Sequence, residues 1–174
     1  MYHLVGPLPG RASCPGRYSY DLDYRLTVPP DQFSAEMLHL VSHGYQAISL
    51  YRLADFLLYG LPLPDHPEAI TLNGGFADEY RYARPVPEAD GLTAAFFPWS
   101  GPIHVKNGEE KCMPSSELSS LGQMGSLGQV GGLEDNWVGR FAWVESSASL
   151  WEWPRVRAYP GESLAAFAAL LAYG

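Results

Sequence analysis

Ala69-Ile-Thr-Leu-Asn-Gly-Gly-Phe-Ala-Asp-Glu-Tyr80 is the stretch of sequence that decides the fold. An apolar run leads into Asn73 and two glycines, and a segment with helical character follows. The pattern predicts a buried strand, a tight glycine turn and a helix, which is the unit from which α/β enzymes are built. Barrel enzymes of this class hold their chemistry in such turns. Here Asn73 and Gly74 stand where a metal-using hydrolase would need two carboxylates.

Strands and helices alternate along the rest of the chain, outside long loops at residues 6–30 and 98–114. Alternation predicts parallel strands joined by right-handed crossovers, and therefore an α/β sheet or barrel. The expected strands are Met1–Val5, Gln46–Ser49, Glu68–Leu72, Thr93–Phe97, Gly128–Gly132, Phe141–Val144 and Arg155–Tyr159. The expected helices are Pro30 to Gly44 with Asp31 as N-cap, Tyr51–Tyr59, Asp78–Ala89 interrupted near Pro85 and Pro87, Glu117–Met124, and Ser163–Ala172.

Three of these helices have an apolar face that should point toward a core. The residues expected to face inward are Phe33, Met37, Leu40 and Val41 in the first helix, Leu50, Leu53, Ala54, Leu57 and Leu58 in the second, and Leu164, Phe167, Ala168 and Leu171 in the last.

Length and composition favour one domain spanning residues 1–174, with 47% apolar residues to form a core. The net charge of -8 argues against nucleic acid or an anionic membrane as partner, because phosphates require clustered Lys and Arg. No apolar run is long enough to span a bilayer, and no leader peptide is recognised, so a cytoplasmic location is the default expectation. The two cysteines, Cys14 and Cys112, exclude a paired-cysteine metal knuckle and leave two thiols or one disulfide open.

Six segments in order resemble the polysaccharide deacetylase family, the NodB-homology domain of carbohydrate esterase family 4. The fourth, Ile70 to Tyr80, is similar to the family's Leu-Thr-Phe-Asp-Asp-Gly-Tyr-x-Asp-Asn-Tyr. The other five are Met1-Tyr-His, Val28-Pro-Pro-Asp-Gln-Phe-Ser-Ala-Glu-Met37, Gly44-Tyr-Gln-Ala-Ile-Ser-Leu50, Gly91-Leu-Thr-Ala-Ala-Phe-Phe97 and Arg155-Val-Arg-Ala-Tyr-Pro-Gly-Glu-Ser-Leu164.

The resemblance implies a distorted (β/α) barrel that removes acetyl groups from sugars, using a divalent metal held by one Asp and two His, and an Asp base. The base position falls on Asn73, and the three metal-ligand positions fall on Gly74, Leu133 and Trp137. All four groups are therefore replaced, and no cofactor is expected. The chain is also short of the roughly 250 residues of a full barrel, so we expect a shortened one with an open edge.

Several polar and aromatic residues are candidates for the cleft that such a fold would keep: Asn73, Asp78, Trp99, Glu134, Asp135 and Trp137. Trp99 and Trp137 could stack on sugars, although packing is the favoured role of Trp137. His3 with Asp78, Glu134 and Asp135, or Glu36 with His39 and His43, could hold a cation, but water-exposed positions are favoured for both sets. His66 and His104 are isolated loop histidines.

The resemblance and the missing groups together predict a catalytically degenerate deacetylase-like protein. It would act as a non-catalytic partner or regulator of a carbohydrate-modifying enzyme, as a homo- or hetero-oligomer, with an active deacetylase as the natural partner. Unpaired edge strands of an open barrel would favour such assembly. Two alternatives stay open: a sugar-binding module with a carbohydrate ligand, and an active hydrolase with an unusual site.

Overall fold

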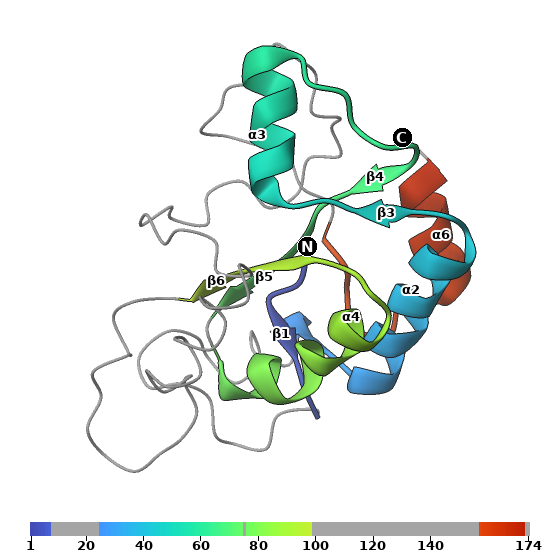
Figure 1. Ribbon diagram of the computed structural model, residues 1–174. Helices are drawn as coiled ribbons and strands as arrows, with labels where there is room; N and C mark the ends of the chain where they lie inside the picture. Colours follow the sequence, from blue (N-terminus) through green and yellow to red (C-terminus); the bar gives the residue numbers. More distant parts are fainter. Residues whose placement is uncertain (8–24, 75, 99–156, 173–174) are drawn as a thin grey trace, which may run out of the picture.

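The structure is a computed structural model, and it describes residues 1–7, 25–74, 76–98 and 157–172 (Figure 1). Several sequence-based predictions lie outside these residues. They are the helix Glu117–Met124, the strands Gly128–Gly132 and Phe141–Val144, and the pairing of Cys14 with Cys112.

The described strands all pair in parallel, as the alternation of strands and helices predicts. They are β1 (Leu4–Val5), β2 (Thr27–Val28), β3 (Gln46–Ala47), β4 (Pro67–Glu68), β5 (Ile70–Gly74) and β6 (Ala94–Pro98). The pairs are β1 with β2, β3 with β4, and β5 with β6. The α/β class is thus confirmed, and the described strands form three two-stranded parallel sheets and no closed barrel.

The beginning of the chain joins these pairs. Tyr2 forms a parallel bridge with Leu72 of β5: its N–H donates to the Thr71 carbonyl at 2.8 Å, and its carbonyl accepts from the Asn73 N–H at 2.8 Å. On its other side, the N–H of Ala158 donates to the Met1 carbonyl at 3.0 Å. Residues 1–3 therefore lie between β5 and the segment that precedes the last helix.

Helices lie above, below and to the right of the strands in Figure 1. Helix α2 (Pro30–Ser42) packs against α6 (Leu164–Ala172), and the π-helix η1 (Glu79–Ala83) contacts both α2 and β1. Helices α3 (Leu50–Tyr59) and α4 (Pro85–Ala89) complete the set. Within the described parts of the chain, no helix has the length and apolar character needed to cross a bilayer.

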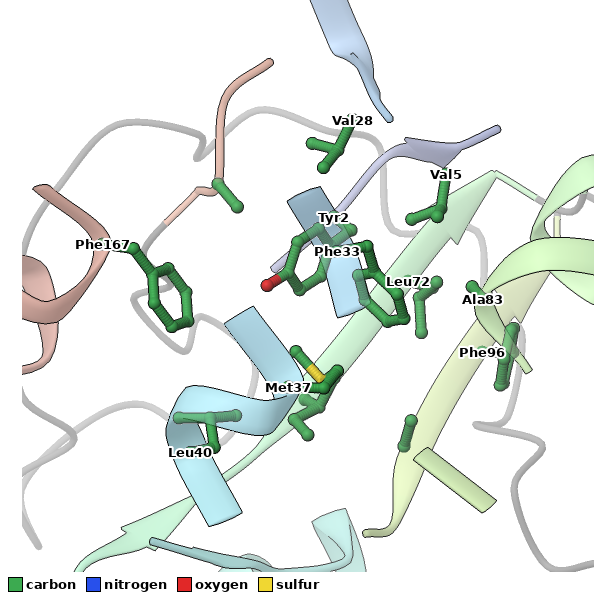
Figure 2. Close-up of a cluster of buried hydrophobic side chains, with 13 residues drawn as sticks. Tyr2, Val5, Val28, Phe33, Met37, Leu40, Leu72, Ala83, Phe96 and Phe167 are labelled. Carbon is green, nitrogen blue, oxygen red and sulfur yellow. The ribbon is translucent and has the colours of Figure 1, made fainter. Parts of the chain in front are cut away.

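The main hydrophobic cluster fills the space between the strands and helices α2 and α6 (Figure 2). Tyr2 and Phe33 meet edge to face at its centre, with ring centroids 4.8 Å apart. The remaining buried members come from all four described ranges: Val5, Val28, Met37, Leu40, Ile70, Leu72, Ala83, Ala94, Phe96, Ala158 and Phe167. Residues far apart in the sequence therefore share one cluster.

Helix α2 begins differently from the prediction. Its N-cap is Pro29, whose extended backbone gives no side-chain cap, and Asp31 lies inside the first turn. Asp31 can still interact favourably with the positive end of the helix dipole. Phe33, Met37 and Leu40 are buried as expected, but Val41 is 41% exposed, because it lies at the margin of the apolar stripe.

Helix α3 has the expected cap and stop but not the expected burial. The Ser49 hydroxyl accepts from the Arg52 N–H at 3.2 Å, and Gly60 ends the helix in the left-handed conformation. No residue of α3 is buried, and Leu58 is half exposed. Helix α3 is therefore amphipathic, but its apolar face does not pack as closely as its sequence predicts.

Other element boundaries also differ from the prediction. Strand β2 lies inside the predicted loop 6–30, residues 157–159 are not assigned to a strand, and Leu164 of α6 is exposed while Phe167 is buried. The helix predicted after β5 is broken as expected at Arg84, before Pro85. The Arg84 N–H donates to the carbonyl of Glu79, five residues back, which gives the π-helical turn.

Candidate functional site

Asn73 and Gly74 lie at the carboxyl end of β5, not in a turn. They pair with Phe97 and Pro98 of β6. The predicted turn at Asn73-Gly74-Gly75 is therefore wrong by two residues, because cross-strand pairing extends the strand beyond its apolar run. The position is still the one where parallel α/β folds place their sites, since carboxyl ends of parallel strands share one edge.

The side chain of Asn73 points to the face opposite the hydrophobic cluster. Ile70 and Leu72 belong to the cluster, and side chains alternate along a strand, so Thr71 and Asn73 point the other way. Because Tyr2 pairs with Leu72, the same alternation puts His3 beside Asn73. Both are shielded from solvent, with Asn73 8% exposed.

Arg157 reaches the same face from the other side of residues 1–3. Its neighbour Ala158 belongs to the hydrophobic cluster, and the Arg157 Nη2 lies 2.8 Å from the His3 Nε2. A guanidinium only donates hydrogen bonds, so Nε2 is the acceptor in this contact. We call His3, Thr71, Asn73 and Arg157 the inner polar face.

Asp78 lies at the carboxyl end of β1, against Gly6. A Cβ atom on Gly6 would be 3.0 Å from the Asp78 Cβ and 3.1 Å from its Oδ2. Burial raises the pKa of the Asp78 carboxyl, and the charge of Arg81 lowers it in part. Asp78 thus lies beside the end of β1, and its role as a cleft residue stays a prediction.

Replacing Gly6 with alanine should lower the free energy of unfolding by about 1–2 kcal/mol, because the new methyl group presses on Asp78. Urea denaturation of both proteins measures the loss. The double variant Gly6→Ala/Asp78→Gly should lose less free energy of unfolding than the two single variants lose together, because it also removes the Cβ of Asp78 that the new methyl group would press on. Simple additivity in this cycle would contradict the packing described.

The residues at the end of β5 do not fit the metal that the resemblance implies. The Asn73 amide cannot take a proton at neutral pH, and Gly74 has no side chain to donate a ligand atom. In the part of the chain that the structure describes, no three His, Cys, Asp or Glu side chains gather closely enough to hold a metal ion. No chemistry through a metal is therefore derived for this site.

The prediction of a solvated helix face for Glu36, His39 and His43 is wrong for Glu36. Glu36 is 1% exposed and accepts a hydrogen bond from the Tyr2 hydroxyl at 2.7 Å, because α2 turns that side toward Tyr2. His39 is partly exposed and His43, the C-cap residue, is exposed, with their rings stacked 3.9 Å apart. His66 remains a loop residue, beside the ring of Tyr45.

The other predicted site residues are outside the described ranges: Trp99, His104, Leu133, Glu134, Asp135 and Trp137. Sequence reasoning missed the roles of Thr71 and Arg157. A signal for Arg157 was present, since it alternates with Val156 and Ala158 in a segment predicted as a strand. Nothing in the sequence indicated that Arg157 reaches His3.

No protein-family model matches the chain, and no curated protein does so either. Solved structures are similar. A polysaccharide deacetylase from Bacillus cereus is 16% identical, with 98% of this chain and 67% of that chain covered and a TM-score of 0.69. The Streptococcus pyogenes deacetylase PplD in complex with acetate is 16% identical, with 72% and 51% covered and a TM-score of 0.55. IcaB from Ammonifex degensii is 17% identical, with 75% and 51% covered and a TM-score of 0.53.

The aligned part of this chain thus spans about half the length of the streptococcal protein and of IcaB, and two thirds of the B. cereus protein. At identities this low, the likeness concerns the fold and not the reaction. The resemblance in the six sequence segments is confirmed at that level, and the chain has the fold of the polysaccharide deacetylases.

Proposed function

We propose that this chain is a catalytically degenerate polysaccharide deacetylase-like protein, and that it acts as a non-catalytic partner or regulator of a carbohydrate-modifying enzyme. One observation carries the proposal. Asn73 and Gly74 occupy the carboxyl end of β5, where the resemblance requires a base and a metal ligand.

The chemistry explains why two replacements are sufficient. A general base contributes typically about 10²–10⁴-fold to the rate of a hydrolysis, and an amide cannot replace it. A metal ion stabilises the developing oxyanion by several kcal/mol, and a glycine offers no atom to hold one. The predicted losses at Leu133 and Trp137 would remove the other two ligands.

The proposal includes a shortened (β/α) barrel whose open edge a partner covers. Among the described residues, the strands form three two-stranded parallel sheets and no closed barrel, which supports an open edge. Strand edges left unpaired within these residues would favour assembly with another chain. A homo-oligomer or a complex with an active deacetylase would both complete the layer.

Metal content and acetate release test the loss of activity. The purified protein should contain no stoichiometric divalent metal and release no acetate from N-acetylated oligosaccharides or acetyl esters. The variant Asn73→Asp/Gly74→Asp/Leu133→His/Trp137→His should take up one metal ion, and a matched variant with only Leu133→His/Trp137→His should bind it far more weakly. Stoichiometric metal with acetate release by the unaltered protein would overturn the proposal.

The regulatory role needs its own measurement. Acetate release by an active polysaccharide deacetylase from the same source organism is followed with and without this protein, and light scattering reports complex formation. A complex with a changed rate is the expected result, and an unchanged rate without a complex would contradict the partner role.

The sugar-binding alternative depends on Trp99 and Trp137, outside the described residues, and stays a prediction that sugar-dependent tryptophan fluorescence can test.

A further inference from the structure

Among the described residues, Arg157 of the inner polar face pairs with His3 and forms no ion pair with a carboxylate. Arginine side chains carry a positive charge in proteins. The Arg157 Nη2 donates to His3, while its Nε is buried and, among the described residues, has no hydrogen-bond acceptor. Neither β5 nor β6 contributes an Asp or a Glu to this face.

Thr71 provides a second donor on the same face. It is 3% exposed, and its Oγ1 is buried without a hydrogen-bond partner in the described part of the molecule. Ala95 lies beside it on β6, and residues 1–3 separate it from Arg157 on the other side. Leaving such donors without acceptors costs free energy, which a bound acceptor would recover.

We propose that the inner polar face binds a small oxyanion, such as a carboxylate or a phosphate group, with Arg157 and Thr71 donating to it. The guanidinium would supply the positive charge at this end of the strands, and its planar donors suit an oxyanion. The Asn73 amide, beside His3, offers further polar contact. The inference goes beyond the proposed function, because binding needs neither hydrolysis nor a partner.

The test measures binding of acetate and of inorganic phosphate by calorimetry and by thermal unfolding. Sodium chloride at the same ionic strength and pH is the reference. Arg157→Gln should weaken binding by about tenfold or more, since it removes a charge-assisted contact. Arg52→Gln, which removes the same charge from an exposed position on α3, should bind like the unaltered protein. Comparison of the two probes shows which oxyanion is preferred.

Thr71→Val gives an independent signature. Without anion it should raise the unfolding temperature, because it removes a buried hydroxyl that lacks a partner. With anion it should gain less stabilisation than the unaltered protein and bind several-fold more weakly. This variant also keeps the test decisive if Arg157→Gln does not fold.

Equal effects of acetate, phosphate and chloride would overturn the inference, as would full binding by both Arg157→Gln and Thr71→Val. These outcomes are separate from the metal and acetate-release assays. Acetate release by the unaltered protein would refute the proposed function but not anion binding by the inner polar face. Insensitivity to anions would refute the binding inference but not the proposed function.

Discussion

Replacing Phe33 with alanine should lower the free energy of unfolding by about 3–5 kcal/mol, the usual cost of emptying an aromatic site in a core. Phe33 is fully buried, and its ring meets Tyr2 edge to face among the strands (Figure 2). The change removes apolar contacts, leaves a cavity and loses the aromatic pair. Because small domains are stable by about 5–15 kcal/mol, much of the total would disappear. Urea denaturation followed by circular dichroism measures it.

Two controls separate packing from helix propensity. Leu38→Ala lies on the same helix but at a position that is 60% exposed, so it should change stability by about 0.5 kcal/mol or less. Phe33→Leu keeps most of the volume and should cost clearly less than alanine. Similar losses for Phe33→Ala and Leu38→Ala would show that α2 does not pack as described.

Replacing Glu36 with alanine should lower the free energy of unfolding by about 2–4 kcal/mol, because it removes the acceptor of one buried and one partly buried hydrogen bond. The Tyr2 hydroxyl donates to Glu36 Oε2 at 2.7 Å, and Gln32 Nε2 donates to Oε1 at 2.8 Å. Gln32 also holds the turn before α6, donating to the Tyr159 carbonyl and accepting from the Gly161 N–H, each at 2.8 Å. Thermal unfolding measures the loss, which Tyr2→Phe should reproduce only in part.

The pKa of Glu36 determines how its contribution to stability changes with pH. Burial raises the pKa of Glu36 above its usual 4.5, and hydrogen bonds from Gln32 and Tyr2 lower it in part. Because its pKa is raised in the folded state, Glu36 contributes stability that is complete below about pH 4.5. This stability is lost as the pH rises through the folded-state pKa. The stability advantage over Glu36→Gln should therefore be largest near pH 4 and shrink as the pH rises above about 4.5.

Comparing the stability of the unaltered protein with that of Glu36→Gln removes the effect of the other titrating groups. Burial also raises the pKa of Glu68 and of Glu162, which adds a trend of the same direction. Burial lowers the pKa of His39, so that this ring costs stability as pH falls through its usual 6.5. Both proteins share these groups. An advantage that grows with pH would mean that Glu36 is stabilised as a carboxylate.

The sequence predicted what local periodicity controls. The apolar run before Asn73 and the run at Thr93–Phe97 became β5 and β6, and Phe33, Met37 and Leu40 became the buried side of α2. It could not predict β2, because two residues carry no period. It also missed the burial of Glu36, since a charged residue on a helix is usually solvated and hydrogen bonds from Tyr2 and Gln32 accompany its burial.

The place of Asn73 and Gly74 in the fold was predictable. Asn73 and Gly74 were identified from the segment that resembles the deacetylase pattern, and they do lie at a strand end. The inner polar face was not predictable, because His3 and Arg157 meet across 154 residues of sequence. Such a contact depends on tertiary pairing, which no local pattern encodes.

The position of residues 1–3 between β5 and Ala158 has a consequence for the newly made protein. Tyr2 and Val5 are synthesised well before Ala158 and Phe167, with which they share one hydrophobic cluster. At ordinary rates of synthesis the interval is on the order of ten seconds or more. During that interval Tyr2 and Val5 must remain without their final contacts, so the segment that carries them is where molecular chaperones would act.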